Sequence, residues 1–80
     1  YRQIYPADQV VCEEGEPGES FYLILKGKVE IFSRRVEQYI ATLNEGEFIG
    51  EMSLLMGIPR SANVRTLEES VLFVIERADL

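Results

Sequence analysis

Two short stretches of the sequence carry groups suited to binding an anion. The first is Gly50-Glu51, which precedes residues 52–56, a run of helix-forming types without a β-branched residue. Free backbone N–H groups at the first turn of a helix favour an anion, and a glycine lets a ligand approach the backbone closely. The second is Arg60-Ser61, whose planar guanidinium and hydroxyl suit phosphate oxygens. The chemistry expected here is phosphate binding.

Glu51 needs a different role, because a carboxylate repels a phosphate. It can instead accept hydrogen bonds from hydroxyl groups such as those of a ribose. Together, Arg60 and Glu51 predict a sugar-phosphate ligand. Other readings stay open for each part. Arg60 could be a surface or ion-pair residue, Glu51 could stabilise a helix dipole, the two could pair with each other, and Gly50 could form a bulge.

Composition excludes several other classes of function. The chain has 80 residues and a net charge of -6 without a basic run, which argues against contact with nucleic acid or an anionic membrane surface. No apolar run approaches the roughly 18 residues that span a membrane. The absence of histidine removes Ser-His and Cys-His nucleophile pairs and most catalytic zinc sites, so no metal or catalytic residue is expected.

Cys12 is the single cysteine, so an internal disulfide is impossible. We expect it to be a small core residue on a strand rather than a reactive thiol, since no histidine is present to activate it. A chain without disulfides favours a cytoplasmic setting, or the cytoplasmic side of a membrane protein.

The elements that must position these residues are mostly short strands. Turn residues recur at steps of about 8–12 residues, which is typical of an all-β protein, here a small antiparallel β-roll of the jelly-roll type. The pattern breaks once, where a helical turn is expected from Glu51 to Met56, closed by Gly57 and ended by Pro59. The strands are expected at residues 9–12, 21–25, 28–31, 39–43, 62–66 and 71–75, and a helix is expected to begin at 76–80.

Two reversals are expected between these strands. Lys26-Gly27-Lys28 predicts a hairpin, because Gly27 can take the positive φ that a tight turn needs. Residues 33–35 are expected to begin the tip of the next hairpin.

The stretch 48–64 closely resembles the phosphate-binding cassette of the cyclic nucleotide-binding domain family. The cassette pattern runs Phe-x-Gly-Glu-hydrophobic-small-Leu and then Pro-Arg-x-Ala-x-Val, and it reads here as FIGEMSL at 48–54 and PRSANV at 59–64. The segment GEPGESFYLILKGKVEIF, residues 15–32, also looks like the family's first barrel hairpin with its turn glycines. The resemblance covers about residues 10–75 and is far more specific than a lone glycine motif.

The resemblance implies a β-roll that binds a 3′,5′-cyclic nucleotide. Arg60 would neutralise the cyclic phosphate, and Glu51 would accept from the ribose 2′-hydroxyl. The phosphate cradle would be completed by backbone amides and by the Ser61 hydroxyl. The ligand-binding residues implied are Gly50, Glu51, Met52, Ser53, Arg60, Ser61 and Ala62.

The choice of base is less determined by the sequence. In the family, Thr directly after the phosphate arginine accompanies cGMP, whereas Ser occurs in members that look cAMP-selective. Ser61 therefore favours cAMP over cGMP as the ligand. Asn63 stands where many members carry Thr, beside the site but outside its main anchors.

Residues 1–80 would form one cyclic nucleotide-binding β-roll cut from a longer protein, without the flanking helices and the lid helix that family members carry. The partner implied is an effector domain of the parent protein, in a channel, a kinase or a transcription regulator. The module would relay ligand binding to that effector by shifting a two-state equilibrium of the flanking helices.

Two other functions compete with a cyclic nucleotide sensor. A degenerate member would keep the same roll without a ligand and serve as an interaction module, but both Glu51 and Arg60 are retained. A carboxylate-based enzyme would use Glu13-Glu14 or Glu68-Glu69, but these pairs sit in turn regions and are expected to be solvated.

Overall fold

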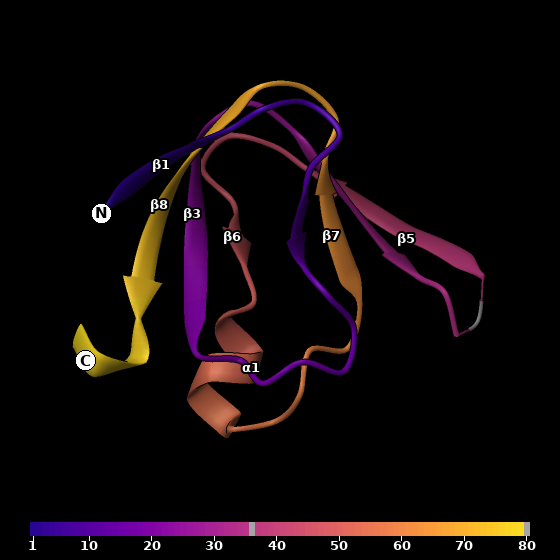
Figure 1. Ribbon diagram of the computed structural model, residues 1–80, viewed down its shortest axis with the longest axis vertical. Helices are drawn as coiled ribbons and strands as arrows, with labels where there is room; N and C mark the ends of the chain where they lie inside the picture. Colours follow the sequence, from indigo (N-terminus) through magenta and orange to yellow (C-terminus); the bar gives the residue numbers. More distant parts are fainter. Residues whose placement is uncertain (36, 80) are drawn as a thin grey trace.

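The fold consists of two antiparallel sheets that face each other, with one short helix at one end of the molecule (Figure 1). The computed structural model describes residues 1–35 and 37–79, and the side chains of 52–54 lie outside this description. One sheet has the strand order β1-β8-β3-β6 and the other β2-β7-β4-β5. The first sheet contains β1 (Arg2–Tyr5), β3 (Ser20–Lys26), β6 (Phe48–Ile49) and β8 (Ser70–Glu76). The second sheet contains β2 (Val10–Cys12), β4 (Val29–Ser33), β5 (Gln38–Leu43) and β7 (Asn63–Thr66). The predicted all-β roll with one helical interruption is confirmed.

The core lies between the two sheets and follows the period of two that a strand dictates. In β3, Tyr22 and Ile24 are buried, and in β8, Leu72 and Val74 oppose them across the ladder. The second sheet supplies Val29 and further small side chains from the facing side. The buried cluster comprises Tyr5, Cys12, Tyr22, Ile24, Val29, Ile49, Val64, Leu72 and Val74.

The helix forms where the sequence predicts it. α1 spans Glu51–Met56, and Gly57 follows with a φ of 67°, the left-handed conformation common after a helix end. At the chain end, where the start of a helix is expected, Arg77–Asp79 form a short 3₁₀ helix, and Leu80 lies outside the described residues.

The hairpin predicted at Lys26-Gly27-Lys28 is wrong. β3 pairs with β6 and β8, whereas β4 pairs with β5 and β7, so the chain passes from one sheet to the other at this turn. Gly27 does adopt a positive φ of 104°, and a Cβ atom there would lie 2.2 Å from the Ser70 hydroxyl oxygen. The corner therefore needs glycine for close packing as well as for its φ. The next hairpin, formed by β4 and β5, is as expected.

Two strands lacked a sequence signal. β1 carries one buried residue, Tyr5, and pairs at the sheet edge with β8, so its sequence shows no apolar pattern. β6 has two residues and pairs with the middle of β3. Both are held by partners far away in the chain rather than by local preference.

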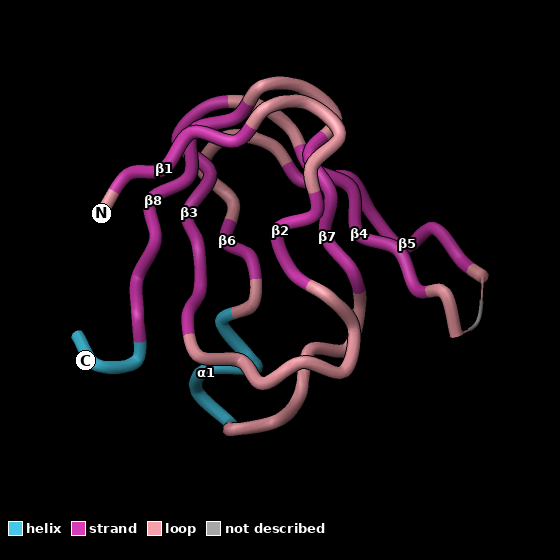
Figure 2. Tube along the Cα trace, viewed as in Figure 1, coloured by secondary structure: helices cyan, strands magenta, loops and turns pink. Residues whose placement is uncertain are grey.

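Two loops cross the end of the roll where α1 lies (Figure 2). One connects β2 to β3 through residues 13–19, and the other connects α1 to β7 through residues 57–62. Backbone hydrogen bonds join the two loops: Gly15 N donates to Arg60 O, and Arg60 N donates to Glu16 O, both at 2.8 Å. This end of the roll positions the candidate site.

Candidate functional site

Arg60 is a buried cation whose guanidinium donates hydrogen bonds to two uncharged carbonyl oxygens. Its residue is 8% exposed. Nη1 donates to the Gly50 carbonyl at 3.3 Å, and Nη2 donates to the Ser20 carbonyl at 2.6 Å. The guanidinium carbon also lies 5.9 Å from the centre of the Tyr22 ring, within reach of a cation–π interaction.

The ion pairs of the described residues involve Arg65 and Arg77, and none of them joins Arg60 to a carboxylate. The alternative in which Glu51 pairs with Arg60 is therefore not what the structure shows. Burying a charge is costly unless a counter-charge compensates it. Among the described residues, therefore, no carboxylate lies within ion-pair distance of the Arg60 guanidinium.

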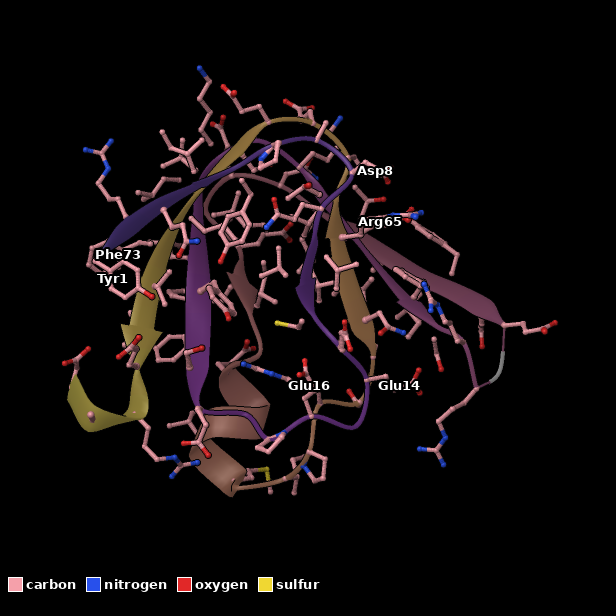
Figure 3. The ribbon with its side chains drawn as sticks, in the orientation of Figure 1. Tyr1, Asp8, Glu14, Glu16, Arg65 and Phe73 are labelled. Atoms are coloured by element: carbon pink, nitrogen blue, oxygen red, sulfur yellow. The ribbon has the colours of Figure 1, made fainter. Side chains whose placement is uncertain are left out.

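Arg65 shows what an internally compensated arginine looks like in this chain. It hydrogen-bonds the Glu30 carboxylate and lies 3.5 Å from a carboxylate oxygen of Asp8. Asp8 and Arg65 lie close together at the end of the roll opposite α1 (Figure 3). The hydrogen bond from Arg65 to Glu30 is the main cause that raises the pKa of Arg65 above its usual value. A hollow of about 480 Å³ includes this residue, but its guanidinium charge is already met.

Gly50 makes room for the guanidinium of Arg60. It has a φ of 77°, and a Cβ atom built on it would lie 2.1 Å from Arg60 Nη1. The sequence predicted a glycine that lets a ligand approach the backbone. The structure adds that an internal side chain, Arg60, already occupies the space beside it.

A cavity of about 190 Å³ brings together five of the seven predicted site residues: Gly50, Glu51, Arg60, Ser61 and Ala62. Glu51 is half-buried at the start of α1, and Ser61 is exposed. Apolar side chains complete the wall of the cavity, namely Cys12, Ile31, Ile49, Ile58, Pro59 and Val64. Met52 and Ser53 follow Glu51 in α1, but their side chains lie outside the described residues.

The chemistry of this cavity is a cation and a carboxylate facing one apolar space. The guanidinium can meet a phosphate, the Glu51 carboxylate can accept from a hydroxyl, and the apolar wall can pack against a ring. Within the described part of the chain, no group of three or more metal-ligating side chains comes together.

Cys12 occupies a core position, as expected. It is 3% exposed on β2, and burial is the main cause that raises the pKa of its thiol. A thiol with a raised pKa holds less thiolate at neutral pH, which weakens it as a nucleophile.

Glu14 corrects the expectation that Glu13-Glu14 is a solvated pair. Glu13 is exposed, but Glu14 is half-buried, and its carboxylate accepts hydrogen bonds from Ser33 Oγ at 2.9 Å and Arg34 N at 3.2 Å. Asn63 Nδ2 also donates to it, at 3.3 Å. Asn63 is itself buried in β7, where a polar side chain needs a hydrogen-bond partner, but nothing in the local sequence indicates that this partner is Glu14.

The described helices include none that is both long and apolar enough to cross a membrane.

Comparison with known proteins places this geometry in a family. Residues 2–80 match the family model "Cyclic nucleotide-binding domain". Over 62 residues the chain is 44% identical to a cAMP-dependent protein kinase regulatory subunit of Pyricularia oryzae, an alignment that covers 78% of this chain and 16% of that protein. Over 81 residues it is 36% identical to the Cyclic AMP receptor protein of Thermus thermophilus, covering 98% of this chain and 38% of that protein.

A solved structure shares the fold of this chain. The cAMP-bound form of the EAL enzyme Bd1971 superposes with a TM-score of 0.90 at 33% identity, covering 99% of this chain and 22% of that chain. The chain thus spans well under half the length of each of these proteins. The matched family model, these relatives and the shared β-roll together show that the chain belongs to the cyclic nucleotide-binding domain family.

Proposed function

We propose that the chain is a regulatory module that binds a 3′,5′-cyclic nucleotide, with cAMP preferred to cGMP, and relays binding to an effector in its parent protein. The observation that carries the proposal is Arg60, a buried guanidinium with uncharged partners beside Glu51 in one cavity. Arg60 meets the cyclic phosphate, and Glu51 accepts from the ribose 2′-hydroxyl. Backbone amides of the cassette at Gly50, Met52, Ser53 and Ala62, with the Ser61 hydroxyl, surround the phosphate.

The preference for cAMP has two supports. Ser61 follows the phosphate arginine, and two relatives carry cAMP in their names, the kinase regulatory subunit and the Cyclic AMP receptor protein. The EAL enzyme Bd1971 supports neither nucleotide over the other, because it has been solved in both a cAMP-bound and a cGMP-bound form.

The output depends on the parent protein. Relatives include a kinase regulatory subunit and a cyclic nucleotide-gated channel of Caenorhabditis elegans, so one type of roll serves different effectors. We propose binding rather than catalysis for this chain, and a cytoplasmic location.

The direct test is isothermal titration of the chain with cAMP and, separately, with cGMP. Arg60→Ala should weaken binding by about 2–4 kcal/mol, the range for losing a charge-assisted partner. Arg35→Ala, which removes the same charge from an exposed residue, is the matched control and should leave affinity unchanged.

Unchanged affinity in Arg60→Ala would contradict the assigned site. Binding of neither nucleotide by the folded chain would favour the degenerate, unliganded module instead. Formation of a nucleoside monophosphate in the same mixture would contradict a purely binding role.

A further inference from the structure

Glu14 connects three segments of the second sheet and its loops. Its carboxylate accepts hydrogen bonds from Ser33 Oγ and Arg34 N at the end of β4. Asn63 in β7 holds it from the other side, with Nδ2 donating to the carboxylate and Oδ1 accepting from the Glu14 backbone N–H at 3.0 Å. Both partner strands belong to the rigid ladder of the sheet, where β4 pairs with β7. Glu14 is therefore a fixed point in the loop between β2 and β3.

The two residues after Glu14 hold the backbone of Arg60. Gly15 N donates to Arg60 O, and Arg60 N donates to Glu16 O. The loop therefore hydrogen-bonds both the backbone N–H and the backbone carbonyl of Arg60. The same segment reaches Ser20, whose carbonyl accepts from Arg60 Nη2. Glu14 and Glu16 lie together at the α1 end of the roll (Figure 3). The place of Arg60 thus depends on how segment 15–20 is anchored, and Glu14 anchors its start.

We infer that Glu14 is a positioning residue for Arg60: its carboxylate fixes Gly15 and Glu16 against the second sheet, and these fix the guanidinium for the ligand phosphate. The part of this inference that concerns affinity rests on the proposed function. A guanidinium held in its bound geometry loses less freedom when the ligand arrives, so anchoring the loop strengthens binding without touching the ligand.

The variant that tests this is Glu14→Gln. It keeps the shape of the side chain, but one carboxylate oxygen becomes an amide NH₂ facing groups that donate hydrogen bonds. Glu13→Gln is the matched control, because it removes the same charge one residue earlier from an exposed side chain.

The first measurement is amide hydrogen exchange without ligand. In Glu14→Gln, the amides of Gly15 and Arg60 should exchange about tenfold faster, whereas those of Leu72 and Val74 in the β8 core should keep their rates. Glu13→Gln should change none of these four. Unchanged rates at Gly15 and Arg60 would overturn the inference, and so would an equal rise at all four, which would indicate a purely global loss of stability.

The second measurement is a double-mutant cycle on cAMP affinity. Glu14→Gln should weaken binding about tenfold in the natural sequence and have little effect when combined with Arg60→Ala, because its action passes through Arg60. An equal loss in both backgrounds would overturn the inference. If the natural chain bound no cyclic nucleotide, the proposed function would fail, and hydrogen exchange would still decide whether Glu14 positions Arg60.

Discussion

At the scale of single residues, the site depends on what surrounds two arginines. Arg65 carries its own carboxylates, Glu30 and Asp8, whereas Arg60 is buried against carbonyl oxygens and an aromatic ring. Within the described residues, one arginine is therefore neutralised by carboxylates of the chain, and the other is hydrogen-bonded to uncharged groups only. The difference lies in the partners, which the fold supplies from distant parts of the chain.

Gly50→Ala should damage binding more than folding. Its Cβ would collide with Arg60 Nη1, the movable end of a side chain, so the guanidinium is displaced while the backbone tolerates the change. The positive φ of 77° adds about 1–2 kcal/mol of strain for alanine. We expect cAMP affinity to fall at least tenfold, measured by titration, and the free energy of unfolding to fall by that strain alone, measured in urea.

Gly46→Ala is the matched control for this substitution. Gly46 also has a positive φ, 87°, but a Cβ atom there would meet nothing within 4 Å. It should lose similar stability and keep its affinity. Equal losses of affinity in the two variants would contradict the role assigned to the space beside Gly50.

The sequence predicted Arg60, Gly50 and Glu51 as site residues from their types and spacing alone, and the structure places all three around one cavity. It did not reveal Glu14, whose partners Ser33 and Asn63 lie 19 and 49 residues away. A carboxylate in a turn-rich acidic loop looks solvated until the strands that cover it are placed. Long-range hydrogen bonds of this kind follow from the fold rather than from local sequence.

At the scale of elements, local signals predicted α1 and failed at the β3–β4 corner. The helix follows from residue preference, the closing glycine and the proline two residues later, all within ten positions. A glycine turn between two apolar strands, by contrast, fits a hairpin and a corner between sheets equally well. Which one forms is decided by pairing with β6 and β8, which are far away in the chain.

Thr66→Val tests how the first strand is joined to the second sheet. Thr66 is fully buried in β7, and its hydroxyl donates to Pro6 O at 2.6 Å and accepts from Gln9 N at 2.9 Å in the β1–β2 turn. Valine keeps the shape and leaves both partners unsatisfied, so the free energy of unfolding should fall by about 1–3 kcal/mol in urea denaturation.

Thr42→Val supplies the control, since the hydroxyl of the half-buried Thr42 makes a solvent-exposed hydrogen bond with the Tyr39 hydroxyl on β5. It should change stability by less than about 0.5 kcal/mol. Affinity for cAMP should be kept in both variants, because the turn lies at the end of the roll opposite α1 (Figure 1). A Thr66→Val chain as stable as the natural one would refute the proposed link.

At the scale of the whole molecule, the core combines ionisable groups from both sheets. Tyr5 and Tyr22 come from the first sheet and Cys12 from the second, and all three belong to one buried cluster. Burial is the main cause that raises the pKa of each: of Cys12 from 9.0, of Tyr22 from 10.0, and of Tyr5 from 10.0 to about 12. The fold therefore depends on keeping these groups neutral.

The pH dependence of stability follows from these directions. A raised pKa means that the folded state holds its proton more tightly than the unfolded chain, so the contribution is complete below the unfolded pKa and is lost as the pH rises through the folded one. For Tyr5 that window runs from pH 10.0 to about 12. We expect urea titrations at a series of pH values to show that the free energy of unfolding begins to fall near pH 9, where the Cys12 thiol of the unfolded chain starts to lose its proton, and falls further up to pH 12.

Tyr5→Phe should flatten the fall in the free energy of unfolding above pH 10, because it removes the buried hydroxyl, whereas Tyr39→Phe, which changes an exposed ring, should not. The same slope above pH 10 in the natural chain and in Tyr5→Phe would show that Tyr5 does not control alkaline unfolding.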